Sequence, residues 1–107
     1  MSKKIHLPIP VISILRKLGK DINNARRRRR IPMRLMAKRA GITEVTLGKI
    51  EKGNPSTSMA GYASVLFILG LTDKLRDIAD ANNDLTGRIL EEENLPQRIH
   101  IQNKNKG

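Results

Sequence analysis

Residues 36–53 have the sequence MAKRAGITEVTLGKIEKG, and this stretch decides the fold. Gly41 is expected to end one short helix, because glycine adopts the left-handed conformation of a helix C-terminus without strain. Thr43 is then a favourable N-cap for the next helix, since its hydroxyl accepts a hydrogen bond from an otherwise unpaired backbone N–H group. The small Ala37 stands where the two helices must cross closely. Two helices joined by a glycine-containing turn of about three or four residues form a helix-turn-helix.

Helical periodicity extends on both sides of this motif. The expected helices span residues 10–29, 32–40, 44–52, 59–69, 72–80 and 84–93. In the first of them, Leu15, Leu18 and Ile22 recur at steps of three and four residues, which is the spacing of one helix face. Pro10 and Pro32 suit the first turns of their helices because proline fixes φ at a helical value. The pattern predicts an all-α fold of five to six helices.

Three parts are expected along the chain. A basic arm, residues 1–10, precedes a helix-turn-helix domain with dimerising later helices, residues 11–94, and a short tail, residues 95–107, follows. Within the tail, residues 98–101 alternate between polar and apolar side chains, which is the period of a short strand. A frayed end is the alternative, because the last six residues are polar.

The expected helix of residues 59–69 is apolar on nearly every side. A helix of this kind must be buried nearly all round, either at the centre of a small domain or with help from another chain. Its inward stripe is expected to comprise Met59, Tyr62, Ala63, Leu66 and Leu69. We expect a second copy of the chain to cover the remainder, since an uncovered apolar patch of this size marks an interface. The residues expected at that dimer interface are Val65, Phe67, Ile68 and Leu71.

Charge is divided unevenly along the chain. Up to Gly53 there are 15 basic and 3 acidic residues, and after it there are 6 basic and 7 acidic residues, within a formal net charge of +11. A strongly basic half beside a nearly neutral half is typical of a protein that binds a polyanion, and nucleic acid is the expected one. The alternative is a basic face that only keeps the protein in solution.

Composition excludes several classes of function. The chain has no cysteine, which rules out disulfide frameworks and cysteine-ligated zinc sites and favours a cytoplasmic location, here with the nucleoid. Tyr62 and Phe67 are its only aromatic residues, too few for stacking unpaired bases. The longest apolar run, residues 65–69, is far shorter than a membrane span. His6 and His100 lie in opposite tails, so we expect no enzyme, no cofactor, no metal site and no membrane partner.

The motif resembles a known family of DNA-binding proteins. Ala37, the turn Ala40-Gly41-Ile42-Thr43 and the closing Ile50-Glu51-x-Gly53 are similar to the Cro-like (XRE) family of phage-repressor-like helix-turn-helix domains. Residues 18–22, Ala25 with the arginine run after it, residues 47–53, residues 62–66 and residues 95–99 are similar to the HipB-like branch of that family. The resemblance covers roughly residues 11–101. Members of the branch are typically encoded beside a HipA-type serine/threonine kinase toxin.

The resemblance implies that Glu44, Val45 and Lys49 approach base edges in the major groove. In chemical terms Lys49 can donate to guanine, Glu44 can accept from the amino group of cytosine, and Val45 can meet the methyl group of thymine. Each contact has an alternative: Glu44 can simply complement the positive end of its helix, and Lys49 can bind phosphate without reading sequence.

A larger set of polar residues is expected to bind the DNA backbone, which supplies affinity and salt dependence without specificity. The expected phosphate contacts are Arg26, Arg27, Arg28, Arg30, Arg34, Lys38, Arg39, Thr43 and Thr46. Arginines at a helix C-terminus also offset the helix dipole, so part of this run can be structural. Glu51 resembles a family glutamate that pairs with a first-helix arginine, and we expect an internal salt bridge there.

Two positions depart from the family pattern. Met33 stands where many relatives have a phosphate-binding glutamine, which puts that contact in doubt. Gly48 lies in mid-helix, where glycine costs about 1 kcal/mol relative to alanine. Either the backbone at Gly48 approaches DNA or a neighbour closely, or the position merely tolerates glycine.

These observations predict a dimeric, sequence-specific repressor that binds double-stranded DNA at an inverted-repeat operator. By resemblance, it represses its own toxin–antitoxin operon and binds the HipA-type kinase as antitoxin or co-antitoxin, with neutralisation shared in some relatives with an additional small antitoxin protein. The acidic later segment is a candidate surface for that protein partner. The alternatives are a stand-alone transcriptional regulator and a general basic nucleic-acid-binding protein without operator specificity.

Overall fold

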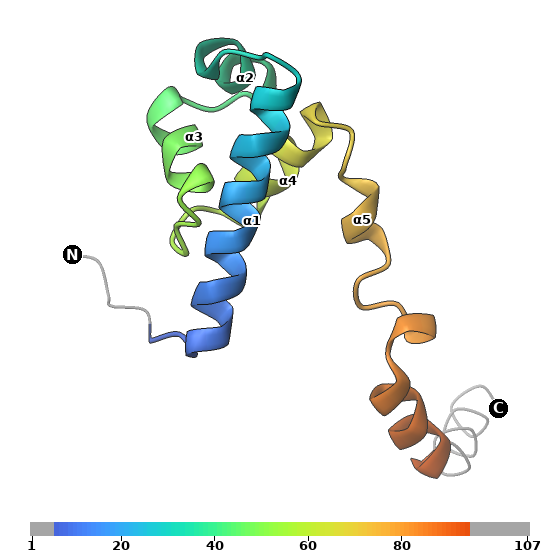
Figure 1. Cartoon of the computed structure of the whole chain (residues 1–107). Helices are drawn as coiled ribbons and strands as arrows, with labels where there is room; N and C mark the ends of the chain where they lie inside the picture. Colours follow the sequence, from blue (N-terminus) through green and yellow to red (C-terminus); the bar gives the residue numbers. More distant parts are fainter. Residues whose placement is uncertain (1–5, 95–107) are drawn as a thin grey trace, which may run out of the picture. The chain divides into compact units, whose positions relative to one another are not determined.

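The computed structural model describes residues 6–94. Every regular element in that range is a helix, which confirms the all-α prediction (Figure 1). The elements are α1 Ile9–Arg28, α2 Met33–Ala40, α3 Glu44–Glu51, α4 Met59–Ile68, α5 Asp73–Arg76, a 3-10 turn at Ala81–Asn83 and a further helix at residues 85–94. The first half of the expected basic arm and the tail with its expected strand, residues 95–107, lie outside the described residues.

The chain forms two compact units, one up to Asp73 and the other from Lys74 onward. The first unit holds every buried hydrophobic side chain of the described residues. Its fully buried side chains are Ile22, Met36, Leu47, Ile50 and Val65. They come from all four of its longer helices, with α1 packed on α3, α2 on both α3 and α4, and α3 on α4. One core therefore holds the helix-turn-helix in place (Figure 1).

The four longer helices of the first unit begin and end within one residue of the predicted bounds. Gly41 follows α2 with φ +71°, the left-handed value that ends a helix. The hydroxyl oxygen of Thr43 accepts a hydrogen bond from the backbone N–H of Thr46 at 3.1 Å, which caps α3. Ser58 caps α4 in the same way, accepting from the N–H of Gly61 at 3.1 Å. Local capping thus places the two helices of the motif independently of any ligand.

α1 and the end of α3 approach so closely that their backbones are in contact. A Cβ atom at Gly19 would lie 2.6 Å from both the backbone nitrogen of Gly53 and the carbonyl oxygen of Ile50. Gly53 itself has φ +74°, and a Cβ atom there would collide with the backbone of Leu15. Only glycine fits at these two positions, because neighbouring backbone atoms cannot move aside as a flexible side chain can. The contact fixes where α3 ends relative to α1.

The predicted inward stripe of α4 is confirmed at Tyr62, Leu66 and Leu69 and is wrong at Met59. Met59, expected inside, is 72% exposed, and Val65, expected at a dimer interface, is 0% exposed. The buried side of the helix instead carries Gly61, Tyr62, Val65, Leu66 and Leu69. Gly61 and Val65 are four residues apart and share one face of the helix, and on this face a Cβ atom at Gly61 would be in ordinary contact, 3.4 Å, with the side chain of Ile50. α4 therefore turns its Gly61–Val65 side toward α3.

The second unit has little internal packing. None of the described residues 74–94 is buried, and Ile78, Leu85, Ile89 and Leu90 are all about half or more exposed. The helix expected over residues 72–80 is shorter than predicted and ends at Arg76. None of its residues is buried, and the carboxylate of Asp80 caps the following 3-10 turn by accepting from the N–H of Asn82 at 2.8 Å. The expected helix over residues 84–93 is present at residues 85–94.

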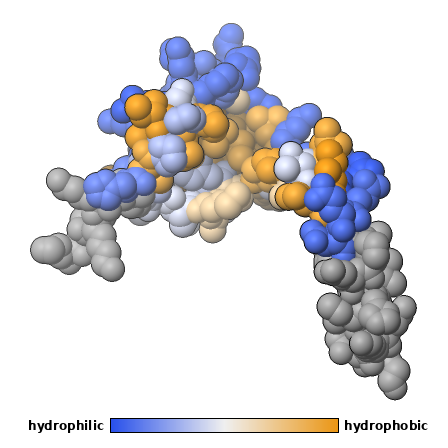
Figure 2. Space-filling model, turned by 90° about the horizontal axis from the view of Figure 1, so that it is seen from below, coloured by the Kyte–Doolittle hydropathy of each residue, from blue (hydrophilic) through white to orange (hydrophobic). Residues whose placement is uncertain are grey.

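The first turns of α1 also leave apolar side chains uncovered. Ile9 is 81% exposed and Ile14 is 65% exposed, whereas Gly19, Ile22 and Ala25 further along the helix are buried. Figure 2 views the molecule from the end where α1 begins and shows apolar side chains gathered over that end of the first unit. Among residues 6–94 no helix combines the length and the apolar character needed to cross a membrane.

Candidate nucleic-acid interface

α3 presents one side to the core and the opposite side to solvent. Leu47 and Ile50, both 0% exposed, anchor it. Glu44, Val45 and Lys49 are exposed, with Val45 at 70%. Their side chains make no hydrogen bond or ion pair to the rest of residues 6–94. The predicted base-contacting residues therefore share one uncovered face of a rigidly held helix.

The start of α3 is organised by two threonines. Thr43 accepts from the backbone N–H of Thr46, and its hydroxyl lies 3.0 Å from the hydroxyl of Thr46, to which it donates. Thr43 is exposed and Thr46 is half-buried. The hydroxyl proton of Thr43 is therefore donated to Thr46, and the hydroxyl proton of Thr46 is left for an acceptor outside this pair. Phosphate contact by the two threonines stays a prediction.

Gly48 lies on the outward side of α3, three residues after Val45. A Cβ atom at Gly48 would meet nothing closer than the terminal methyl group of Met33, 4.0 Å away, in an otherwise open space. No other part of the described chain thus crowds Gly48. Close approach of a neighbouring part of the chain therefore does not explain the glycine at this position. Met33 is half-buried and begins α2, so its methyl group borders the outward side of α3.

Arg26 is not a phosphate contact, and that prediction is wrong. Its side chain is only 10% exposed, and its Nε donates to Oε2 of Glu51 at 2.7 Å. Its Nη1 also donates to the carbonyl oxygen of Ile31 at 2.8 Å, and Asn23 donates to Oε1 of Glu51 at 2.6 Å. Arg26 thus ties α1 to α3 and to the connection before α2. The predicted internal salt bridge of Glu51 is confirmed.

Arg29 has a structural role that the sequence does not reveal. Its guanidinium donates to the carbonyl oxygen of Ala25 at 2.9 Å and to that of Leu69 at 3.0 Å. The first carbonyl lies in the last turn of α1, where it also accepts from the backbone N–H of Arg29 at 3.3 Å, and the second belongs to the C-cap residue of α4. No periodicity signals such a contact, because its two ends are 40 residues apart in the chain.

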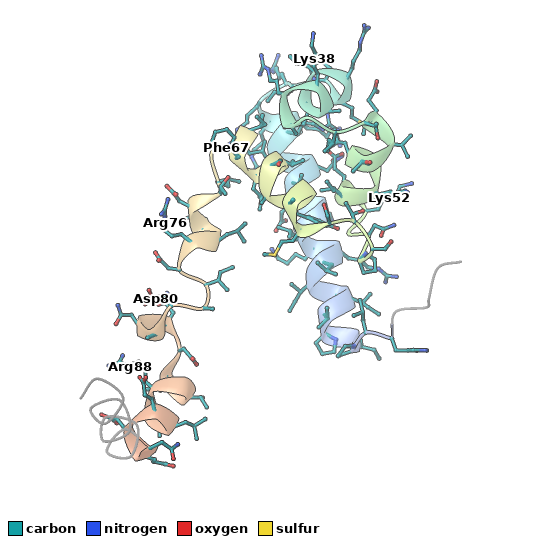
Figure 3. The ribbon with its side chains drawn as sticks, turned by 180° about the vertical axis from the view of Figure 1, so that it is seen from behind. Lys38, Lys52, Phe67, Arg76, Asp80 and Arg88 are labelled. Atoms are coloured by element: carbon teal, nitrogen blue, oxygen red, sulfur yellow. The ribbon has the colours of Figure 1, made fainter. Side chains whose placement is uncertain are left out.

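The remaining predicted phosphate-binding cations are all exposed. They are Arg27, Arg28, Arg30, Arg34, Lys38 and Arg39. They come from the end of α1, the connection after it and α2. Arg30 has the left-handed value φ +53°, which is uncommon for a residue other than glycine. In Figure 3 Lys38 extends from α2 and Lys52 from the end of α3, both away from the core.

The connection between α3 and α4 is fixed by Tyr62. Its hydroxyl donates to the carbonyl oxygen of Asn54 at 2.7 Å, and its ring is buried. Desolvation by burial raises the pKa of the Tyr62 phenol above its usual 10.0. Tyr62 therefore stays a neutral hydrogen-bond donor at physiological pH and holds the loop that follows α3.

Three of the expected dimer-interface residues remain at the surface. Phe67 is 70% exposed, and Ile68 and Leu71 are half-buried. Val65 is enclosed in the core of its own chain and is not available for that contact.

Within residues 6–94 no group of three His, Cys, Asp or Glu side chains is arranged to hold a metal ion. Comparisons of this chain with protein-family models, curated proteins and solved structures found no match.

Proposed function

We propose that this protein is a sequence-specific DNA-binding repressor that inserts α3 into the major groove of an operator. The observation that carries this proposal is the uncovered face of α3, with Glu44, Val45 and Lys49 exposed above an anchor of Leu47 and Ile50. The major groove is about 12 Å wide and admits a helix held in this way. In this role α3 reads base edges while flanking residues hold the backbone, and the protein acts without catalysis.

The backbone contacts come from the six exposed cations of α1, α2 and the connection between them: Arg27, Arg28, Arg30, Arg34, Lys38 and Arg39. Each phosphate neutralised contributes about −0.9 to the slope of log affinity against log salt. Six contacts give a slope of about −5 per protomer. Arg26 adds nothing to this slope, because its guanidinium group is buried and paired with Glu51.

The protein binds as a homodimer, with two copies of α3 spaced roughly 34 to 36 Å apart over an inverted repeat. The exposed ring of Phe67, with the half-buried Ile68 and Leu71, supports the end of α4 as the surface that a second copy covers. Burying an exposed phenylalanine contributes about 1.5–3 kcal/mol to association. A two-fold axis there gives each operator half-site one recognition helix.

A mobility-shift assay with the DNA upstream of the gene and an excess of unrelated competitor tests the proposal. Lys49→Ala is expected to weaken the operator complex about tenfold or more and to leave binding to unrelated duplexes unchanged. Arg27→Ala is the matched control, because loss of a phosphate contact weakens all duplexes alike. Equal wild-type affinity for operator, unrelated DNA and structured RNA would instead identify a general basic nucleic-acid-binding protein, the alternative function.

A specific observation favours a second function, protein-partner binding by residues 74–94. None of these residues is buried, and their exposed apolar side chains stand beside acidic ones such as Asp77, Asp80 and Glu92. By resemblance to the HipB-like branch, the partner is a HipA-type kinase toxin in the cytoplasm, alone or with an additional small antitoxin. Co-purification with the kinase from a neighbouring gene tests this role. Leu85→Glu is expected to abolish capture while operator binding persists; unchanged capture would contradict it.

A further inference from the structure

Gly48 differs from Gly19 and Gly53, the two glycines at which α1 meets the end of α3. At Gly19 and Gly53 a side chain would collide with neighbouring backbone, so packing within the chain requires glycine. At Gly48 a Cβ atom would have only the Met33 methyl group nearby, at 4.0 Å, which is ordinary van der Waals contact. Gly48 also lies inside α3, where glycine is the least favourable residue apart from proline. The fold of the described chain therefore gives no reason for glycine at this position.

The outward position of Gly48 supplies a reason that lies outside the chain. Leu47 and Ile50 point into the core, so Val45 and Gly48, three residues apart, lie together on the opposite side of α3. Val45 is 70% exposed, and Met33 reaches the same side from the first turn of α2. These residues form an apolar strip, Val45–Gly48–Met33, with bare helix backbone at its centre. The strip offers no side-chain hydrogen bond.

An apolar strip in the major groove has one natural target. Among the groups that base pairs present there, the 5-methyl group of thymine is the apolar one, whereas the other distinguishing groups are hydrogen-bond donors or acceptors. A side chain at Gly48 would hold the helix away from the base pairs by the width of a methyl group. Its absence allows the α3 backbone to approach until Val45 and Met33 touch a base.

We propose that the strip of Val45, Gly48 and Met33 recognises a thymine methyl group in each operator half-site, with Gly48 allowing the close approach. This inference rests on the proposed DNA-binding function; it keeps the thymine methyl group expected for Val45 and adds Gly48 and Met33 to its recognition. It also assigns Met33 a new contact, since a thioether cannot take over the phosphate hydrogen bond of the glutamine found at that position in relatives.

The first experiment removes the methyl group from the DNA. The wild-type protein selects its preferred duplex from a random library, and each thymine of that duplex is then replaced by deoxyuridine, which keeps the base pair. We expect one position per half-site to lose about fourfold in affinity, and about fifteenfold when both half-sites are changed, because one buried methyl-sized group changes a binding constant by about that factor. When that T·A pair is replaced, the duplex with 5-methylcytosine·guanine is expected to bind the protein more tightly than the duplex with cytosine·guanine.

The second experiment fills the gap in the protein. Gly48→Ala has open space within the chain, and alanine favours the helix, so Tm is expected to rise by about 4–8 °C. Affinity for the selected operator is expected to fall tenfold or more, and affinity for unrelated duplexes to stay within twofold. A variant that is more stable yet worse at operator binding cannot be explained by misfolding.

The outcomes separate this inference from the function on which it rests. If the library yields no preferred duplex, the proposed repressor function fails first. If a preferred duplex is found but deoxyuridine changes nothing at any position, thymine recognition is overturned while operator binding stands. Gly48→Ala binding the operator as tightly as wild type overturns the close approach in the same way.

Discussion

Glu51→Ala is expected to remove a large part of the stability of the first unit. The substitution takes away the acceptor of three hydrogen bonds, two from Arg26 at 2.7 and 3.2 Å and one from Asn23 at 2.6 Å. The Arg26 side chain is 10% exposed and that of Glu51 is 6% exposed, so the arginine is left charged and unpaired away from water. Removing one partner of such a pair costs about 3–5 kcal/mol, against a typical total of about 5–15 kcal/mol for a domain.

Urea unfolding followed by helical circular dichroism measures the loss, as a lower midpoint at an unchanged m value. Lys17→Ala is the matched control, because Lys17 and Asp21 form a salt bridge of 2.6 Å on the same helix with exposed fractions of 77% and 54%. An exposed pair four residues apart contributes only about 0.3–0.5 kcal/mol. The two pairs have similar lengths, so the contrast compares a buried carboxylate that accepts three hydrogen bonds with an exposed one that accepts a single bond.

A double variant, Arg26→Met with Glu51→Leu, completes the test. Replacing both partners by apolar side chains of similar volume is expected to recover most of the stability, since no buried charge remains. Its salt slope for DNA is expected to match the wild type, because Arg26 is not available to phosphate. A Glu51→Ala loss below about 1 kcal/mol, or one no larger than that of Lys17→Ala, would refute the reasoning.

Three further predictions follow from other contacts. Gly19→Ala is expected to cost about 1–3 kcal/mol in urea unfolding, since its Cβ atom would lie 2.6 Å from the carbonyl oxygen of Ile50 and from the backbone nitrogen of Gly53; wild-type stability would show that the helices can separate freely. Desolvation raises the pKa of Tyr62 above 10.0, so the contribution of Tyr62 to stability is complete below pH 10 and is lost as the pH rises through the folded-state pKa. Tyrosinate absorbance measures the titration of Tyr62 directly, because the chain has one tyrosine. Titration at the ordinary pKa would contradict the burial. Phe67→Glu is expected to shift the protein from dimer to monomer in analytical ultracentrifugation with little change in unfolding free energy, since the ring is 70% exposed; a dimer that persists would place the interface elsewhere.

The helix-turn-helix itself could be predicted closely from the sequence because its ends are set by local chemistry. Gly41 and Thr43 act through their own backbone and the next turn, so no distant contact is needed to anticipate them. The inward residues Leu47 and Ile50 follow from their spacing alone. The same spacing leaves Glu44, Val45 and Lys49 outside, as the structure has them.

In the arginine run, residues 26–30, the sequence predicts a salt bridge without directly identifying the arginine that forms it. A salt bridge to Glu51 was predictable, but five consecutive arginines hide which one is the partner. The buried stripe of α1 contains the needed signal, since Gly19, Ile22 and Arg26 are spaced three and four residues apart on one face. Extending the stripe into the charged run identifies Arg26. Nothing local identifies Arg29, whose acceptor at Leu69 is set by tertiary packing.

α4 could not be oriented from its sequence for the opposite reason. A helix that is apolar nearly all round gives no preferred face, so periodicity cannot tell Met59 from Val65. The choice is made by tertiary packing, in which the side of Gly61 and Val65 faces Ile50 of α3. The length of α5 was also unpredictable, because capping and apolar spacing overstate a helix that has no core to pack against.

The backbone contact of α1 with the end of α3 holds α3 in place without using the side chains on the outer side of α3. Gly19 and Gly53 set the pose of α3 through main-chain atoms, and the side chains on its outer side take no part in holding it. Those outer positions can therefore be exchanged as a set without disturbing the scaffold. Under the proposed DNA-binding function, a small library at Glu44, Val45, Gly48 and Lys49 is a direct route to variants that bind other DNA sequences.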